Sequence, residues 1–366
     1  MNILYLTNHL NVGGITSYLL TLATGMKERG HNVYVASGPG TFADSFPGRG
    51  IEYIRVPANT KAEISPNLVS CALKLLPVLK DRDIDVIHSN TRVTQVLGCL
   101  LSRLSKRHFV STCHGFFKKR LTRRLFPCWG EKVIAISQQV KEHLVLDFGV
   151  KEGDIRIIHN GIDTEKFKPR EAALKPGIKN SLGLRDAPVI GIIARLSDVK
   201  GHAYLIEAMK TVLAEFPSAQ LFIVGEGKMK GGLLGLCSRL GIAKSVFFRD
   251  NVPDTNEALC AMDIFVLPSL AEGLGLSLME AMATGIAPIG SDIGGIRTLI
   301  RDGSNGFLVE PGNPQALALK IIELLRDPGR RKTFADNAAE FISANFSKEK
   351  TVLETERLYL ECLNAK

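Results

Sequence analysis

Residues Ala271 to Ala283, AEGLGLSLMEAMA, form the stretch from which the fold can be read. An apolar run, Ile264 to Leu267, precedes this stretch. The break at Pro268-Ser269 and two glycines then lead into a helix-forming segment that stops at Thr284-Gly285. This order predicts a strand, a glycine-rich turn and the start of a helix. The free N–H groups and the positive dipole end of such a helix favour a bound phosphate.

Two carboxylates lie in this stretch, Glu272 in the predicted turn and Glu280 about one turn inside the helix. Both can reach a ligand that lies across the helix start, where they would accept hydrogen bonds from hydroxyl groups, worth roughly 1.5 to 3 kcal/mol each. We therefore expect a ligand with an anionic centre and hydroxyls at both ends, such as a nucleotide sugar. Alternatively, Glu280 is a solvated helix residue and Glu272 a turn residue near a dipole end.

The size and composition of the chain indicate a globular protein with two domains. It has 366 residues, of which 45% are hydrophobic and 23% charged. No apolar run reaches the roughly 18 residues of a membrane span, and the N-terminus lacks a basic export signal. The seven cysteines are scattered and never form a CxxC pair, which is typical of reduced thiols. We therefore expect a cytoplasmic protein.

Short apolar runs alternate with helical runs in both halves, which predicts an α/β fold with parallel sheets covered on both faces. Ligands bind such sheets at the carboxyl ends of the strands. The predicted strands are 3–7, 33–36, 53–56, 86–88, 109–112, 133–136 and 155–158 in the first half, and a strand from Val189, 220–224, 246–248, 264–267 and 287–289 in the second.

A polar stretch with Pro and Gly runs through Asp186 and separates the two series. We expect a first domain at residues 1–165 and a second at 166–347. The amphipathic helix at about 348–366 is long enough to pack back onto the first domain. The excess of positive charge, +9 in total, falls mostly in residues 1–165.

Several polar residues follow predicted strands at the ligand edge. Arg195 ends the first strand of the second half and Lys200 begins the next helix, so together they could neutralise a diphosphate without a metal. His114 is followed by Gly115, which permits close approach of a ligand, and we expect it to be functional. For His88 a structural and a functional role are equally supported.

The segment from Phe116 to Phe126 interleaves basic and apolar residues. We favour binding to an anionic membrane surface, with a solvated charge run or polyanion binding as alternatives. The basic residues are Lys118, Lys119, Arg120, Arg123 and Arg124. The DxD patterns of Asp81 to Asp85 could hold a divalent metal, but they precede a strand, away from the ligand edge, so we predict no metal site there.

Taken together, the motifs resemble the retaining glycosyltransferases of family 4. The resemblance rests on the early GG loop, NGID at 160–163, ARLSDVKG at 194–201, VGEG at 224–227, EGLGLSLME at 272–280, PIGSDIGGI at 288–296 and NGFLVEPGN at 305–313. It implies the GT-B fold, in which two Rossmann-like doubly wound parallel-sheet domains face each other across a cleft.

The resemblance also implies roles for single residues. Glu272 would contact the donor sugar and Glu280 the ribose, Arg195 and Lys200 the diphosphate, His114 the region of the donor sugar, and Gly14 the loop near diphosphate and acceptor. Catalysis would rest on Arg195, Lys200, Glu272 and His114; donor binding would add Gly273, Leu274, Gly275 and Leu276, with Asn251 and Val252 near the base. The sequence departs from the family pattern at Leu274, Thr298 and Asp250.

The implied activity is transfer of a hexose, with retention, from a UDP- or GDP-linked sugar to an acceptor hydroxyl. No cofactor or metal is expected, nor any nucleic acid. The basic segment from Phe116 to Phe126, rather than the resemblance, leads us to expect a cell-envelope glycan, as in lipopolysaccharide assembly, or a lipid-linked molecule as acceptor, with the protein peripheral on the inner face of the plasma membrane. The alternatives are a nucleotide-sugar 2-epimerase and a non-catalytic module on the same scaffold that binds membranes or polyanions.

Overall fold

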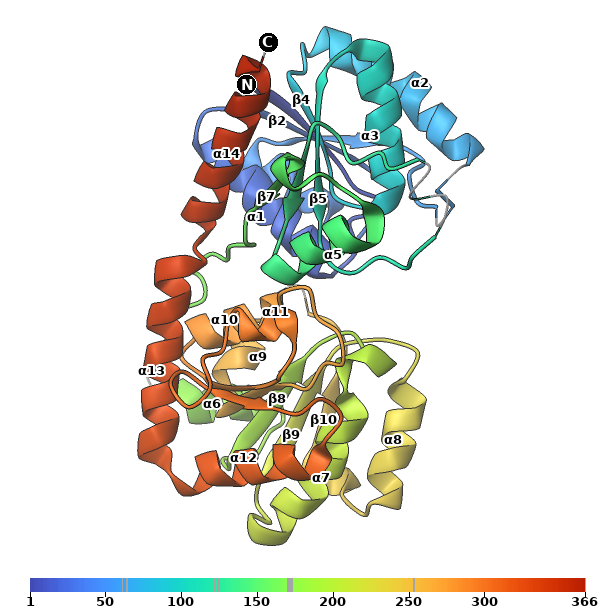
Figure 1. The fold of residues 1–366 in the computed structure, drawn as a ribbon. Helices are drawn as coiled ribbons and strands as arrows, with labels where there is room; N and C mark the ends of the chain where they lie inside the picture. Colours follow the sequence, from blue (N-terminus) through green and yellow to red (C-terminus); the bar gives the residue numbers. More distant parts are fainter. Residues whose placement is uncertain are drawn as a thin grey trace. The chain divides into compact units, whose positions relative to one another are not determined.

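The computed structural model describes residues 1–60, 62–63, 65–120, 123, 126–169, 174–252 and 254–365. The chain forms two compact units (Figure 1). One unit consists of Met1–Gly161 together with Lys348–Lys366, and the other of Ile162–Ser347. Each is described by itself below.

The first unit is built on a parallel sheet of seven strands in the order β3-β2-β1-β4-β5-β6-β7. Its strands are β1 (Asn2–Leu6), β2 (Asn32–Ser37), β3 (Glu52–Arg55), β4 (Val86–Ser89), β5 (His108–Cys113), β6 (Lys132–Ala135) and β7 (Ile155–Ile157). Its helices are α1 (Gly14–Glu28), α2 (Pro66–Asp81), α3 (Arg92–Ser105), α5 (Gln138–Phe148) and α14 (Lys348–Asn364), with short 3₁₀ turns at Ala43–Ser45, Pro47–Arg49 and Glu152–Asp154.

The second unit is built on a parallel sheet of six strands in the order β10-β9-β8-β11-β12-β13. Its strands are β8 (Val189–Ile193), β9 (Gln220–Val224), β10 (Val246–Arg249), β11 (Ile264–Leu267), β12 (Ala287–Ser291) and β13 (Phe307–Val309). Its helices are α6 (Lys175–Ser181), α7 (His202–Glu215), α8 (Lys230–Arg239), α9 (Asn256–Cys260), α10 (Leu276–Ala283), α11 (Gly294–Arg297), α12 (Pro314–Arg326) and α13 (Pro328–Asn345), with 3₁₀ turns at Asp198–Lys200 and Ala243–Ser245.

Burial of apolar strands explains why both sheets form. Strands such as β1, β9 and β11 are nearly continuous apolar runs, and helices cover the sheets, as expected for parallel sheets. The predicted α/β class with two Rossmann-like parallel sheets is therefore confirmed. β13 was not among the predicted strands. None of the helices in the described parts of the chain has both the length and the apolarity that spanning a membrane requires.

The strand order places a topological switch point in each sheet. The chain reverses its direction of winding between β1 and β4 in the first sheet and between β8 and β11 in the second. In doubly wound sheets, ligands bind in the crevice at the carboxyl ends of the two strands that flank this point. The loops after these four strands are therefore the places to look for a site.

Candidate active site

The crevice of the second sheet is formed by the loops that follow β8 and β11. The two loops are in direct contact, since the Leu270 N–H donates to the Val199 carbonyl at 2.8 Å. Gly201 ends the β8 loop with φ +72, and a Cβ atom there would lie 1.9 Å from the Pro268 carbonyl oxygen. Only glycine fits this position. Its close contact with Pro268 brings the loop that carries Lys200 next to the loop that carries Glu272.

Lys200 and Glu272 meet across this contact. The Lys200 ammonium donates a hydrogen bond to Oε2 of Glu272, and Oγ of Ser269 lies 3.4 Å from the same oxygen. Both side chains are largely buried. In the crevice, the charges of Lys200 and Glu272 therefore neutralise each other. An anionic ligand that attracted Lys200 would free Glu272 to accept hydrogen bonds from hydroxyl groups.

Helix α10 begins at the same crevice. Its N-cap, Gly275, has φ +102 and no side chain to accept a hydrogen bond from the first-turn amides. Those amides, from Leu276 onward, are thus available to an anion. Leu274, in the turn before α10, is buried. Gly295 packs against the same turn from the next loop, and a Cβ atom at Gly295 would lie 2.4 Å from the Glu272 carbonyl oxygen.

Glu280, in the second turn of α10, is partly buried. Its Oε2 accepts a hydrogen bond of 2.9 Å from Oγ1 of Thr255. Burial raises the pKa of Glu280 to about 7, against the opposing effects of the Thr255 hydroxyl and the Lys166 charge. Glu280 is therefore not a solvated helix residue. Sequence reasoning missed Thr255 and Lys166, which come from separate segments and carry no motif.

Arg195 lies in the loop after β8, where Ala194 separates it from the strand, and its side chain is exposed. No group in the described ranges forms an ion pair or hydrogen bond with its guanidinium, so it is free to bind an anion. Asn251 and Val252 follow β10, further along the same edge. The Asn251 N–H donates to Oε1 of Glu226 at 3.2 Å, and Asp250 forms an ion pair with Lys230.

The first sheet presents a second polar group at its own switch point. Gly14 begins α1 at an exposed position after β1, and His114 follows β5. Nε2 of His114 lies 3.3 Å from Oδ1 of Asn90, which follows β4. The predicted His114 thus lies beside a residue for which sequence reasoning proposed no role. His88 is fully buried and contacts Tyr359 and Thr112, so its surroundings are those of a structural residue.

Comparison with known proteins identifies the family. The model of the family described as "Glycosyltransferase Family 4" matches residues 12–166, and that of "Glycosyl transferases group 1" matches residues 175–341. The chain is a family 4 glycosyltransferase. It is thus an enzyme of the transferase class, and the comparisons favour neither the epimerase nor the non-catalytic alternative.

Three similar proteins illustrate the relationship. A glycosyltransferase of Methanocaldococcus jannaschii is 29% identical over 95% of this chain and 94% of its own length. An Escherichia coli protein named UDP-Gal:alpha-D-GlcNAc-diphosphoundecaprenol alpha-1,3-galactosyltransferase is 29% identical over 79% of this chain and 78% of its own. The crystal structure of Anabaena HepE with UDP-glucose superposes with a TM-score of 0.88 at 24% identity, covering 99% of this chain and all of that one, which confirms the GT-B fold.

The basic segment of this glycosyltransferase divides into an exposed part and a buried part. Lys118, Lys119 and Arg120 are exposed, although Lys119 pairs with Asp147 at 2.7 Å. Arg123 differs from the prediction of a surface residue, because its side chain is only 11% exposed and binds Glu63. Arg124 lies outside the described residues.

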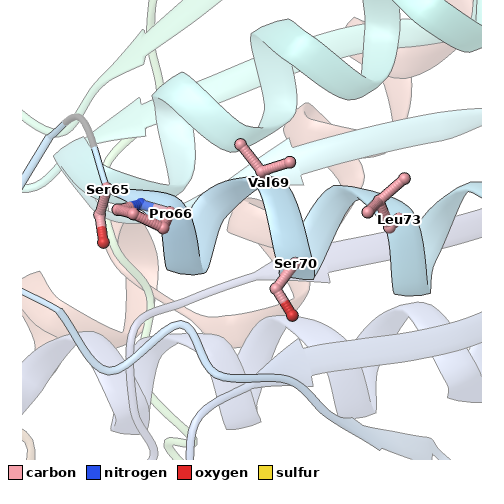
Figure 2. Close-up of a pocket in the computed structure, with 5 residues that line it drawn as sticks. All are labelled: Ser65, Pro66, Val69, Ser70 and Leu73. Atoms are coloured by element: carbon pink, nitrogen blue, oxygen red, sulfur yellow. The ribbon is translucent and has the colours of Figure 1, made fainter.

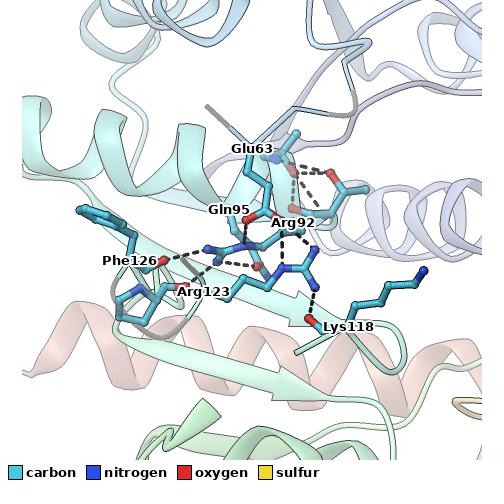
Figure 3. A network of polar contacts seen from close by, with 9 residues as sticks. Glu63, Arg92, Gln95, Lys118, Arg123 and Phe126 are labelled. Atoms are coloured by element: carbon cyan, nitrogen blue, oxygen red, sulfur yellow. Dashed lines mark hydrogen bonds and ion pairs between the residues drawn. The ribbon is translucent and has the colours of Figure 1, made fainter. Parts of the chain in front are cut away.

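Figure 3 shows the network that holds Arg123. Glu63 also pairs with Arg92 at 3.2 Å, and Arg92 donates to the carbonyls of Phe126 and Pro127. Arg123 donates in turn to the Lys118 carbonyl at 2.8 Å. Through Arg123 and Arg92, the network links the carbonyls of Lys118, Phe126 and Pro127 to Glu63, which precedes α2.

Helix α2 presents an apolar stripe on its outer side. A groove of about 670 Å³ is lined by Ser65, Pro66, Val69, Ser70 and Leu73 (Figure 2). Val69 and Leu73 are 55% and 67% exposed. This surface is on the helix that follows Glu63.

No group of three or more His, Cys, Asp or Glu side chains that could hold a metal gathers within the described parts of the chain. In the DxD patterns, Asp85 accepts a hydrogen bond of 2.7 Å from the Asn2 N–H, and Asp83 pairs with Arg107. Asp83 and Asp85 therefore link the turn before β4 to Arg107 and Asn2.

Proposed function

We propose that the enzyme transfers a sugar, with retention, from a UDP- or GDP-linked donor to an acceptor hydroxyl. The observation that carries the proposal is the group of polar residues at the switch point of the second sheet. Arg195, the Lys200–Glu272 pair and the uncapped start of α10 gather there, with Glu280 one turn further along. A diphosphate suits the cations and the amides, and hydroxyls on either side suit the two acids.

In the proposed reaction, the bond between the anomeric carbon and the donor phosphate breaks, and both electrons go to the phosphate oxygen. Arg195, Lys200 and the first amides of α10 stabilise the charge that develops there. The acceptor oxygen bonds to the anomeric carbon from the same face, and its proton passes to the leaving phosphate. The two cations supply the neutralising charge, so no metal is needed for this step.

Glu272 and Glu280 have separate roles in this proposal. The diphosphate attracts Lys200 away from Glu272, whose carboxylate then accepts hydrogen bonds from the donor sugar. Glu280 accepts hydrogen bonds from the ribose. Asn251 and Val252 lie near the base, and the Gly273 to Leu276 turn holds the diphosphate. Glu272 is also the available carboxylate for a double displacement, which a trapped glycosyl-enzyme adduct would reveal.

The test is turnover of UDP- and GDP-sugars by wild type and by Arg195→Ala and Lys200→Ala. Each substitution is expected to lower kcat by about 10²- to 10³-fold while the fold survives. Lys210→Ala, at an exposed position on α7, is the matched control and should keep normal turnover. Near-normal turnover in both site variants would contradict the assignment. EDTA should leave the wild-type rate unchanged.

The stereochemistry is read from the same reaction by NMR of the anomeric proton of the product. An α-linked donor should give an α-linked product. A β-linked product would contradict retention. Formation of the 2-epimer of the donor sugar, with no transfer, would identify the epimerase alternative.

The proposed acceptor is a glycan or lipid-linked molecule of the cell envelope, reached at an anionic membrane surface. The support is a relative whose name specifies a diphosphoundecaprenol acceptor, together with exposed residues of the first unit. The exposed cations are Lys118, Lys119 and Arg120. The Lys118 carbonyl is linked through Arg123 to Glu63, near the start of α2, whose outer side carries Val69 and Leu73. A basic surface beside an apolar stripe is typical of proteins that lie on anionic bilayers.

Vesicle co-sedimentation tests this surface. Wild type should bind vesicles that contain phosphatidylglycerol more tightly than vesicles of phosphatidylcholine alone. The triple variant Lys118→Glu, Lys119→Glu, Arg120→Glu and the variant Leu73→Ser should both weaken binding, at roughly 1 kcal/mol for each basic residue. Leu319→Ser, at an exposed position on α12, is the control. Equal binding by all variants would contradict the proposed surface.

A further inference from the structure

Asn90 is a buried amide at the switch point of the first sheet. It follows β4, its backbone N–H donates to the Leu6 carbonyl at 2.9 Å, and the residue is 1% exposed. Because Leu6 ends β1, Asn90 lies between the two strands that flank the crevice. This is the position where a doubly wound sheet binds its ligand.

Only one of the two polar atoms in the Asn90 side-chain amide has a hydrogen-bond partner among the described residues. Its Nδ2 atom is buried, and no group in the described ranges accepts a hydrogen bond from it. Leaving a buried donor without a partner is unfavourable, so such a residue calls for an explanation other than packing. Its Oδ1 atom has one partner, Nε2 of His114 at 3.3 Å.

The contact with Asn90 bears on the tautomer of the His114 ring. An amide oxygen can only accept a hydrogen bond, so this contact requires a proton on Nε2 of His114 and leaves the lone pair on Nδ1. The ring of Tyr18 packs edge-on at 4.6 Å, and His88 is the nearby titratable group from β4. Burial lowers the pKa of His114 to about 3, so the ring is neutral at physiological pH.

The second ring nitrogen of His114 is Nδ1. Among the described residues none donates a hydrogen bond to Nδ1 of His114, and the ring is partly exposed. Gly14 and the uncapped start of α1 lie on the helix that carries Tyr18, and a Cβ atom added at Gly13 would meet open space. A neutral imidazole with an unoccupied lone pair at this edge accepts a hydrogen bond from a ligand hydroxyl.

We propose that Asn90 is a positioning residue that holds His114 in the Nε2–H tautomer, so that Nδ1 accepts a hydrogen bond from a sugar hydroxyl. This inference rests on the proposed sugar transfer. It adds Asn90 as a residue that affects the substrate by orienting His114. The ligand class is a sugar, and the hydroxyl belongs to the donor or to the acceptor.

The first test is the tautomer, read by two-bond ¹⁵N–¹H correlations in protein labelled with ¹⁵N-histidine. Wild type should show protonated Nε2 and unprotonated Nδ1 at His114. Asn90→Leu should lose this preference, and Asn67→Asp, an exposed position on α2, should leave it unchanged. Protonated Nδ1 in the wild type would overturn the inference. This readout needs no activity, so it is independent of the proposed function.

The second test is the pH dependence of kcat/KM. Asn90→Asp keeps an acceptor at Nε2 but adds a negative charge, which raises the pKa of His114. Protonation of His114 removes the Nδ1 lone pair, so Asn90→Asp should lose activity as pH falls from 8 to 6. In wild type, His114 stays neutral over this range and should cause no such loss. A wild-type pH profile in Asn90→Asp would overturn the inference even if Arg195→Ala and Lys200→Ala behave as proposed.

Analogues identify the hydroxyl. Asn90→Leu should lower kcat/KM about ten- to a hundredfold for intact substrates. The loss should disappear when the hydroxyl that His114 binds is removed, either from the donor sugar or from the acceptor. If each single deoxy analogue of donor and acceptor still shows the full loss in Asn90→Leu, the inference fails.

Discussion

At the scale of single residues, Glu280 carries a conflict between stability and function. Burial disfavours its charged form and raises its pKa to about 7, yet the charged form is the stronger acceptor for a ribose hydroxyl. Only one hydroxyl, that of Thr255, bonds to the carboxylate within the described residues. The charged Glu280 carboxylate therefore lowers the stability of the empty enzyme, and it contributes to binding once a ligand supplies further hydrogen-bond donors.

Glu280→Gln is expected to be more stable than wild type at high pH. The folded-state pKa of Glu280 lies above its ordinary value of 4.5, so the wild-type enzyme loses stability as pH rises from about 4.5 to 7. Thermal denaturation at pH 8 should show a gain of up to about 3 kcal/mol for the variant, which shrinks toward pH 5. Glu207→Gln, exposed on α7, is the control. A destabilised Glu280→Gln at pH 8 would contradict this account.

The Lys200–Glu272 pair should couple measurably in the empty enzyme. Lys200→Gln and Glu272→Gln each leave a partly buried charge without its partner, so the double variant should be less destabilised than the sum of the two. We expect a coupling energy on the order of 1 kcal/mol from urea denaturation. Saturation with a nucleotide sugar should remove this coupling. Coupling that persists in the complex would show that the ligand does not separate the pair.

Residues near chain motifs could be predicted from the sequence, and their distant partners could not. The EGLGLSLME stretch placed Glu272, Gly275 and Glu280 at one strand–turn–helix junction because that pattern is local. Glu63, the partner of Arg123, lies 60 positions away, so an arginine in a basic run was interpreted as a surface residue. Thr255 gave no signal because its contact with Glu280 depends on the path of the chain.

At the scale of elements, the donor site depends on how tightly its turns pack. The turn before α10 is supported by Gly295, whose position leaves no room for a side chain. The strand–turn–helix order of this region was predicted correctly because its apolar run and glycines are strong local signals. The three-residue strand β13 was missed, although β7, which has the same length, was predicted.

Gly295→Ala is expected to displace the Glu272 turn. The added Cβ atom would lie 2.4 Å from a backbone oxygen and 2.6 Å from a backbone carbon, neither of which can move alone. We expect a loss of about 1–3 kcal/mol in stability and weaker donor binding by calorimetry. In Gly232→Ala, on α8, the new atom meets open space, so this control should be neutral or gain about 0.5–1 kcal/mol. Equal effects of the two substitutions would contradict the packing argument.

At the scale of the whole molecule, the C-terminal helix belongs to the first unit. Helix α14 packs against α1, where Val352 contacts Gly25. Glu356 of α14 binds both Arg29 and His31 at 2.6 Å. The last residues of the chain thus stabilise the sheet formed by its first residues. Amphipathic periodicity predicted this helix, but the sequence could not name Arg29 and His31 as its partners.

Glu356→Gln is expected to destabilise the enzyme by on the order of 2 kcal/mol at pH 7. The Arg29 guanidinium and the His31 ring lower the pKa of Glu356, so its contribution is present above about pH 4.5 and is lost as pH falls below that value. Glu361→Gln breaks an exposed pair with Arg156 and should change stability by less than about 1 kcal/mol. Similar losses in the two variants at pH 7 would contradict the role of the buried group.

The most direct test of the donor site is a thermal-shift titration with UDP-, GDP- and ADP-sugars. The account predicts that a UDP- or GDP-sugar raises the Tm of wild type in a concentration-dependent way. The shift should be lost in Arg195→Ala and reduced in Glu280→Gln, and it should be intact in Lys210→Ala. The account would be contradicted if no nucleotide sugar raised the Tm, or if Arg195→Ala gave the full wild-type shift.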